Sequence, residues 1–303
     1  MKLNKKITIG AIVAACMMLT PLVANKAQAV SQKGKLQLKS DTVVFINNRK
    51  GQPLTKYRGK TAEAKSGKTF KYYGKPRIIG KHAYYYIGYK GYINGDDVGN
   101  LDGKPVLNVA HNSYIYGKNG KRLRKYRGSR RNTFVYKGTA LKYRGKVTKL
   151  SNNKNKDYYY YLDDKKSQKM WLPYKVIKGK QYYYLGAGGY IKAANISRIN
   201  GKYLYARSAN IKLNKRSWEN KRYVPIYNEK GKKTSKSIKG GSWEKVDYTV
   251  STNLPEQDND FGFDYFHIKG KKDEYIEAYD VDIMPMQNLV DKTIKGMYAF
   301  PVI

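Results

Sequence analysis

The chain has little cysteine, histidine or tryptophan: one Cys, three His and three Trp in 303 residues. Its single cysteine, Cys16, lies near the N-terminus, so the remainder of the chain excludes disulfides and thiol chemistry. The histidines His82, His111 and His267 stand far apart and show none of the spacings that place two imidazoles on one metal ion. We therefore expect no metal and no cofactor.

Long apolar stretches are absent beyond the N-terminus, where nothing approaches the roughly 20 apolar residues of a membrane span. At the N-terminus, Lys2, Lys5 and Lys6 precede an apolar stretch from residue 7 to 24 and the small residues Ala27 and Ala29. This pattern predicts a signal peptide over residues 1–29, cleaved after Ala29, and hence a secreted protein with no transmembrane segment after cleavage. A lipid anchor at Cys16 and an uncleaved membrane anchor remain alternatives.

Acidic residues are also scarce, with 22 Asp and Glu against 61 Lys and Arg, a net charge of +39. Residues 104–149 contain no acid at all, whereas residues 256–282 are rich in them. Such an imbalance costs self-repulsion and is usually tied to a polyanionic partner. The middle of the chain is therefore predicted to carry the anion-binding surface, and the C-terminal part to differ from it.

The most informative feature is a repeated phrase. Residues 78–93 read IIGKHAYYYIGYKGYI, residues 177–191 read IKGKQYYYLGAGGYI, and residues 266–276 give a looser copy. Each copy follows a turn-like phrase, at 45–51, 115–121 and 226–232. Repetition of this kind predicts a tandem array. We expect modules over residues 36–100, 105–198 and 199–303, with the second extended by an insertion near 151–169.

The abundance of tyrosine, of β-branched residues and of regularly spaced glycines predicts an all-β protein of short strands. Asn119-Gly120 is a strong hairpin signal, because this pair accepts the positive φ angles of a tight turn. Modules of this size must build open or closed small barrels, since a single hairpin buries too little surface.

The tyrosine triplets 84–86 and 182–184 lie in predicted strands, where successive side chains point to opposite faces. The middle tyrosine of each triplet is expected to point inward and the flanking two outward. The outward residues would form an aromatic strip able to stack on sugar rings. The alternative is that tyrosine is present only as a good strand former. The predicted aromatic site residues are Tyr84, Tyr86, Tyr182, Tyr184 and Tyr190.

Lysine and arginine form the second candidate site. Arginine can engage one phosphate with two donors, and lysine supplies a mobile point charge. The alternative is a solvated basic face without a ligand. The predicted polymer-binding basic residues are Lys81, Lys90, Lys118, Lys121, Arg122, Arg124, Lys125, Arg127, Arg130, Arg131, Lys178, Lys180 and Lys192.

Catalysis is not expected. Residues 258–262 resemble the start of a calcium loop, but the sequence lacks the Gly and Glu of an EF-hand. Glu256, Asp258, Asp260 and Asp264 could supply a carboxylate pair for glycoside hydrolysis, which leaves a wall hydrolase as the weakest hypothesis. A second hypothesis is an extracellular polyanion-binding adhesin for DNA or glycosaminoglycans, with nucleic acid bound non-specifically.

The phrases SYIYGKNGKR at 113–122 and KVIKGKQYYYLGAGGYIKAANI at 175–196 resemble the SLAP domain of lactobacillus-type surface-layer and surface-layer-associated proteins. This resemblance implies SH3-like barrels and non-covalent attachment to the cell wall through teichoic or lipoteichoic acid, beside other surface-layer proteins. Its motif positions here are residues 182–184, 189–192 and 195. The third copy departs from the motif, because Glu274 and Glu277 flank Tyr275-Ile276 and Glu277 takes the place of Lys192.

Overall fold

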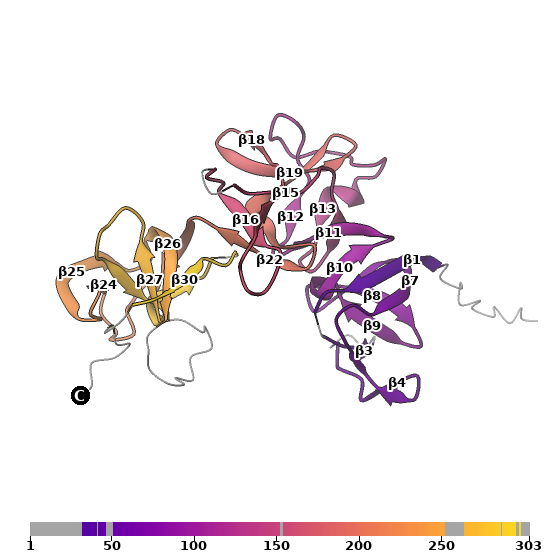
Figure 1. Ribbon diagram of the computed structural model, residues 1–303, viewed down its shortest axis with the longest axis horizontal. Coiled ribbons are helices and arrows are strands. Elements are labelled where there is room, and N and C mark those ends of the chain that lie inside the picture. The colour runs from indigo at the N-terminus through magenta and orange to yellow at the C-terminus, as the bar shows by residue number, and fades with distance from the viewer. Residues whose placement is uncertain are drawn as a thin grey trace, which may run out of the picture. The chain divides into compact units, whose positions relative to one another are not determined.

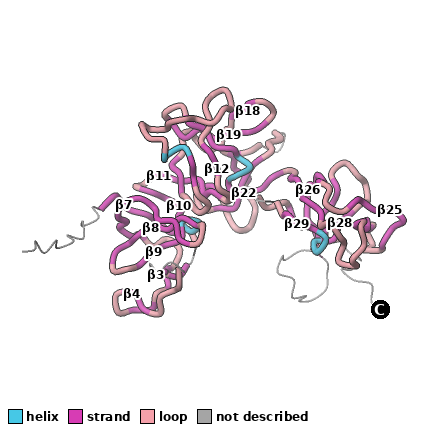
Figure 2. The backbone as a smooth tube through the Cα atoms, turned by 180° about the vertical axis from the view of Figure 1, so that it is seen from behind, coloured by secondary structure: helices cyan, strands magenta, loops and turns pink. Residues whose placement is uncertain are grey.

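The computed structural model describes residues 32–40, 42–46, 51–151, 154–251, 264–285, 287–294 and 297. Figure 1 shows an all-β chain within them, as the sequence predicts. In the described part of the chain, the only helices are four single-turn 3-10 helices. Figure 2 draws these turns in cyan. The predicted signal helix, its cleavage residues Ala27 and Ala29, and Cys16 lie outside the described residues.

The chain contains three repeat units, and in each of them the first strand pairs antiparallel with the last. In the first unit, residues 32–101, β1 (Gln32–Leu38) pairs antiparallel with β10 (Val98–Leu101). In the second, residues 104–199, β11 (Lys104–Val109) pairs with β21 (Ile196–Ile199). In the third, residues 209–283, β23 (Ala209–Leu213) pairs with β29 (Val281–Ile283). A register shift interrupts each of the three pairings, so the repeat extends to local irregularities.

A hairpin followed by a 3-10 turn forms the centre of each unit. The hairpins are β8 (His82–Gly88) with β9 (Gly91–Asn94), β19 (Lys180–Gly186) with β20 (Gly189–Lys192), and β27 (Tyr265–Ile268) with β28 (Tyr275–Glu277). The 3-10 turns η1 (Gly95–Asp97), η3 (Ala193–Asn195) and η4 (Ala278–Asp280) follow directly. The three tyrosine-rich phrases of the sequence thus form the same local structure three times.

The turn-like phrases upstream pair with these hairpins. Phe45 is the register partner of Tyr92, Tyr116 of Tyr190, and Tyr227 of Tyr275. Each pair joins the two repeated phrases that the sequence places together, which explains why both phrases recur at each copy.

The second unit contains additional strands. β16 (Tyr158–Tyr161) pairs with β17 (Lys169–Trp171), which pairs with β15 (Thr148–Lys149). On its other side β16 pairs with β22 (Lys202–Ala206), which lies beyond the closing strand β21. Residues 148–171 therefore add three strands to one end of the large sheet.

The remaining described elements are short apart from four longer strands, and complete the sheets. They are β2 (Thr42–Val43), β3 (Phe45–Ile46), β4 (Lys56–Tyr57), β5 (Lys60–Thr61), β6 (Glu63–Ala64), β7 (Thr69–Ile79), β12 (Ser113–Tyr114), η2 (Arg131–Thr133), β13 (Phe134–Val135), β14 (Ala140–Lys142), β18 (Lys175–Ile177), β24 (Tyr223–Tyr227), β25 (Lys233–Lys239), β26 (Trp243–Ser251) and β30 (Val290–Thr293).

The sheets are not closed barrels. The first unit contributes the order β10-β1-β7-β8-β9-β3, in which the end strands do not pair, and β10 continues instead through β11 and β21 to β22 and β16. The third unit follows the open order β25-β24-β28-β27-β26-β23-β29. The SH3-like barrels that the family resemblance implies are therefore not confirmed. Sequence periodicity indicates which residues face inward, but it does not tell whether the last strand returns to the first.

Buried side chains gather in three large clusters. One includes Leu36, Tyr85 and Ile93, a second Leu107, Tyr183 and Ile191, and a third Ile211, Phe266 and Ile276. The members are largely β-branched, leucine or tyrosine side chains, the residues that pack well on a pleated surface. Each cluster lies beneath one hairpin. The opposite face is partly open to solvent on the first two hairpins, at Tyr84, Tyr86 and Tyr184, whereas every residue of β27 and β28 is buried.

Candidate polymer-binding surface

The predicted basic residues lie on the surface. Of the thirteen, all are exposed except Lys192, which is half-buried. None of them forms an ion pair with a carboxylate of the described residues, although ten pairs exist there, including His82–Asp96 and His267–Asp247. Lys81, Lys90 and Lys178 stand in turns with φ values of 73°, 60° and 50°. These positive charges face solvent without local compensation.

Aromatic rings accompany several of these cations. The guanidinium carbon of Arg122 lies 3.8 Å from the centroid of the Tyr114 ring. The Lys192 ammonium lies 5.2 Å from the Tyr116 ring centroid. A cation over an aromatic face is attracted by the ring quadrupole, which orients a long side chain. The second unit therefore presents oriented cations beside apolar rings.

The tyrosine triplets follow the predicted alternation in the first unit and depart from it in the second. Tyr85 is buried while Tyr84 and Tyr86 are half-buried. In the second unit Tyr183 is fully buried and Tyr184 is 38 % exposed, but Tyr182 is only 3 % exposed. Tyr182 was expected to face solvent, and this expectation is wrong.

The physical reason is a small second cluster on the outer face of the hairpin. Tyr182 packs there with Tyr116 and Ile177, and the rings of Tyr116 and Tyr182 are 5.4 Å apart. The turn phrase 115–121 covers this end of the strand, so alternation alone could not reveal the burial. Tyr184 and Tyr190 remain paired across the hairpin with centroids 5.0 Å apart.

A Lys-Tyr-Arg-Gly turn supports the hairpin in each of the first two units, at residues 56–59 and 125–128. The Tyr57 hydroxyl donates to the Ile87 carbonyl at 2.9 Å, and the Tyr126 hydroxyl donates to the Leu185 and Gly186 carbonyls at 3.3 and 3.2 Å. The sequence reasoning missed this turn. Its signal was the tetrapeptide itself, which occurs a third time at residues 142–145.

The arginine of this turn is fixed by the same contacts. Arg127 donates from Nη2 to the Leu185 carbonyl at 2.9 Å and lies 5.1 Å from the Tyr126 ring centroid. In the first unit Arg58 lies 4.2 Å from the Tyr89 ring centroid. Both arginines have positive φ, 46° and 51°, and precede a glycine of positive φ. The turn thus holds one guanidinium in a defined place beside each hairpin.

A cavity of about 240 Å³ adjoins Arg127 where the first and second units meet. Its lining includes Tyr72, Tyr126, Arg127 and Lys142. Lys142 is bound to Asp102 at 2.5 Å. Burial acts to raise the pKa of Asp102, but hydrogen bonds from Lys142 and from the Lys35 amide hold it below its ordinary value. Arg127 is therefore the cation of this cavity that no described carboxylate neutralises.

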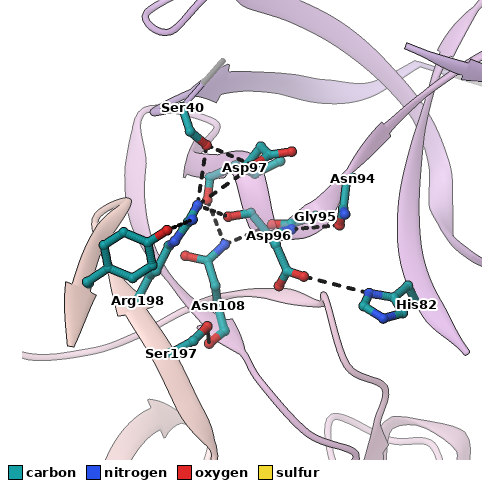
Figure 3. Close-up of polar contacts among 11 residues, drawn as sticks. Ser40, His82, Asn94, Gly95, Asp96, Asp97, Asn108, Ser197 and Arg198 are labelled. Atoms are coloured by element: carbon teal, nitrogen blue, oxygen red, sulfur yellow. Dashed lines mark hydrogen bonds and ion pairs between the residues drawn. The ribbon is translucent and has the colours of Figure 1, made fainter. Parts of the chain in front are cut away.

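Polar contacts join the first two units, as Figure 3 shows. Asn108, which is fully buried, donates from Nδ2 to the carbonyls of Gly95 and Val98, both at 2.8 Å. Arg198 donates to the Ser40 hydroxyl at 3.3 Å and to the Asp96 carbonyl at 3.0 Å, and its Nη1 lies 3.7 Å from an Asp97 oxygen. The η1 turn of the first unit is thereby held by side chains from two strands of the second.

Two of the three histidines contact a carboxylate of a neighbouring element. His82 lies 3.7 Å from Asp96, whose pKa is raised by burial despite this neighbour. His267 binds Asp247 at 2.7 Å and stacks on Tyr248 with centroids 4.2 Å apart. Among the described residues no group of three His, Cys, Asp or Glu side chains could hold a metal ion. Asp258 and Asp260, candidates for a carboxylate pair, lie outside the described residues.

Several acids of the third unit that the structure describes are paired with lysine or buried. Glu274 binds Lys236 at 2.6 Å, Glu219 binds Lys233 at 2.9 Å, and Asp282 lies 3.6 Å from Lys212. Glu277 and Asp280 are buried. The third unit thus differs from the second, because several of its lysines pair with carboxylates and the predicted basic residues of the second unit do not. Across the described residues, no helix has the length and apolar character of a membrane-spanning segment.

Comparison with known proteins gives one family match. The family model described as the surface layer protein A domain matches residues 161–194. A search of curated proteins found no match. The matched segment runs from the end of β16 through β20 into η3 and contains Lys178, Lys180, Lys192 and residues 182–184. Over this segment the chain is similar to the surface layer protein A domain, and its recognition as carrying a SLAP-type domain is confirmed there.

Proposed function

We propose that this protein attaches, without catalysis, to anionic polymers of the bacterial cell wall. The segment similar to a surface-layer domain suggests a role associated with the surface layer at the cell surface. The observation that carries the finer proposal is the set of twelve exposed lysines and arginines that no described carboxylate neutralises. Teichoic or lipoteichoic acid, with one phosphate in each repeat, has the matching chemistry.

The affinity of such a surface comes from release of counterions from the polymer, as for nucleic acids. A lysine acts as a point charge, whereas Arg122 and Arg127 each present a planar group held by an aromatic ring or a carbonyl. The half-exposed rings of Tyr184 and Tyr190 would contact substituents on the polymer. Weak contacts along a repetitive chain add up because each one raises the effective concentration for the next.

The first two units act together in this proposal, and the third contributes little to polymer binding. We propose residues 36–100, 105–198 and 199–303 as the three modules, which share the repeated hairpin and 3-10 turn. The mature protein would begin at Val30 after secretion.

The test is binding of the chain 30–303 to purified cell walls, before and after extraction of teichoic acids, across a salt series. Binding should disappear on extraction. If five phosphates are neutralised, affinity should fall roughly a hundredfold between about 50 and 200 mM salt. Binding that survives extraction, or DNA that displaces the protein from walls as well as teichoic acid does at equal charge, would overturn the proposal in favour of another polymer or of a general polyanion adhesin.

Charge variants of the same chain locate the surface. Replacing Arg122, Arg124, Lys125 and Arg130 together by Gln should flatten the salt dependence and weaken wall binding. The matched control replaces Lys215, Lys230, Lys232 and Lys239, which are equally exposed in the third unit and remove the same charge. Equal loss by both variants would show that net charge, rather than this surface, determines binding.

A further inference from the structure

A second cavity has a different character from the basic surface. Its volume is about 480 Å³, and it is lined by residues of the second unit and its insertion and by residues of the third unit. Its charged lining consists of one carboxylate, Asp157, and one ammonium, Lys245. The lining is therefore close to neutral, in contrast to the uncompensated lysines and arginines of the polymer-binding surface.

One wall is the outward face of the β26–β23–β29 sheet. Trp243 and Ile283 are register partners of Lys212 on its two sides, and Asn210 lies two residues before Lys212 on the same face. Trp243 is 57 % exposed and Ile283 is 41 % exposed, while Ile211 on the opposite face is fully buried. The wall thus offers a flat indole, an aliphatic side chain and an amide.

The other wall comes from residues 157–194. The Gln181 amide donates to Asp157 Oδ2 at 2.6 Å, and the Tyr174 hydroxyl donates to the same oxygen at 3.3 Å. These contacts fix the carboxylate and the amide where they line the cavity. A carboxylate that already accepts two hydrogen bonds retains further acceptor sites for a ligand hydroxyl.

Hydrogen bonds hold the two walls together. Gln287, which is buried, donates from Nε2 to the carbonyls of Ala194 and Ile196 at 2.7 and 3.0 Å. The backbone of Asn288 exchanges hydrogen bonds with Ala206 and Leu204, at 2.9 and 3.1 Å. Hydrogen bonds of a buried side chain and of the backbone therefore keep the two walls of the cavity in place, in addition to its exposed side chains.

We propose that this cavity binds one or two neutral pyranose residues. The C–H face of a pyranose ring is apolar and packs on an indole, while its hydroxyls need both donors and acceptors. Trp243 supplies the platform, and Asn210, Gln181 and Asp157 supply the polar groups. The volume is within the ordinary range for small-ligand sites. The sugars come either from a neutral wall polysaccharide or from substituents on a phosphate polymer.

The test uses the chain 30–303 with Trp171 and Trp218 replaced by Phe, so that Trp243 is the only tryptophan. Its fluorescence is followed during titration with free glucose, galactose, N-acetylglucosamine and a disaccharide of each. We expect a saturable change for at least one sugar, with little dependence on salt because no net charge is involved. No saturable change with any of them would overturn the proposal.

Variants measured by calorimetry supply the second criterion. Trp243→Ala should weaken binding of the active sugar by roughly tenfold or more, the loss typical of an aromatic anchor, and Trp243→Phe by less. Tyr223→Ala removes an aromatic residue of similar exposure, 51 %, from the same unit outside the cavity and should have no effect. Unchanged binding by Trp243→Ala would contradict the assignment.

Polymers then identify the source of the sugar. Binding of a neutral wall polysaccharide, or of glycosylated but not unglycosylated teichoic acid, should follow the same variants. The quadruple variant of the basic surface should retain sugar binding. Loss of wall binding in that variant with sugar binding intact would separate this site from the polymer-binding surface, and either proposal can fail without the other.

Discussion

At the scale of single residues, Tyr85 and Tyr183 occupy equivalent positions in the first two units but differ in hydrogen bonding. The Tyr85 hydroxyl donates to the Ala140 carbonyl at 3.1 Å and accepts from the Ala140 amide at 3.2 Å. The Tyr183 hydroxyl is buried and has no hydrogen-bond partner among the described residues. Burial raises the pKa of Tyr183 well above its ordinary value. The same residue type thus stabilises one unit and costs desolvation in the other.

We therefore expect opposite results from the same substitution. Tyr85→Phe should lower the free energy of unfolding by about 1–2 kcal/mol, because it leaves the buried Ala140 groups without a partner. Tyr183→Phe should leave stability unchanged or raise it by about 1 kcal/mol, because it removes an unsatisfied hydroxyl. Urea unfolding of both variants measures the difference. Equal destabilisation would mean that the Tyr183 hydroxyl has a partner in solution.

At the scale of elements, the tyrosine of the Lys-Tyr-Arg-Gly turn packs directly against a glycine of the hairpin. A Cβ atom added at Gly189 would lie 2.3 Å from Tyr126 Cε2, and one added at Gly91 would lie 2.6 Å from Tyr57 Cε2. Only a residue without a side chain lets the tyrosine ring lie on the strand and reach the carbonyls beyond it. The glycines of GYI in the repeated phrase therefore have a packing role.

Gly189→Ala should displace the Tyr126 ring and destabilise the second unit by about 1–3 kcal/mol, the usual cost of overpacking. It should also weaken wall binding, since Arg127 shares the turn. Ala187→Gly in the same hairpin is the control. Ala187 has φ 48°, so removing its methyl group should be neutral or slightly stabilising. Thermal unfolding and wall binding measure both, and tolerance of Gly189→Ala would contradict the close packing.

A buried carboxylate pair makes the third unit sensitive to pH. Burial, with Asp280 nearby, raises the pKa of Glu277 from 4.5 to about 7, and burial raises the pKa of Asp280 from 3.8 to about 6. The Tyr227 hydroxyl donates to Glu277 at 3.3 Å, and the Trp218 amide donates to Asp280 at 2.7 Å. The folded state therefore binds these protons more tightly than the unfolded chain does.

Protonation of Glu277 and Asp280 therefore stabilises the folded state. This contribution is fully present below about pH 4 and is lost as pH rises through about 6 to 7, with roughly 3 kcal/mol from Glu277. Glu277→Gln should reduce this slope and stabilise the third unit at pH above about 7. Urea unfolding followed by Trp218 and Trp243 fluorescence, with Trp171→Phe as background, measures it. Glu274→Gln removes a carboxylate paired with Lys236 on the surface and should keep the slope. An unchanged slope in Glu277→Gln would assign the pH dependence elsewhere.

The repeated phrases predicted the strands and the burial of Tyr85 and Tyr183, because period-two alternation reports directly on the core face. They could not predict the burial of Tyr182, which depends on a contact with the distant turn phrase around Tyr116. They also could not predict the open sheets, since closure depends on whether the end strands β10 and β3, which lie far apart in the sequence, pair with each other. The burial of Glu277 is of the same kind, because an acid in a polar sequence context gives no local sign of a core position.

At the scale of the whole molecule, the first two units share one sheet and a polar joint. β10 pairs with β11, and Asn108 and Arg198 bind the η1 turn of the first unit. Sites on both units therefore keep a defined separation, and a polymer that binds one meets the other at a high effective concentration. We expect these two units to unfold together rather than as independent modules.

Asn108→Ala tests this coupling. It removes the side-chain donor to the Val98 carbonyl and to the Gly95 carbonyl, which still accepts from the Val98 amide, and should destabilise the first two units by about 1–3 kcal/mol. Hydrogen exchange should rise in β1 and β10 as well as in β11 and β21. Asn112→Ala is the matched control, because Asn112 is exposed and accepts one hydrogen bond, from the Lys137 amide. Exchange that rises in the second unit alone would show that the joint does not couple the two, and the fixed separation of their binding sites would then have no structural basis.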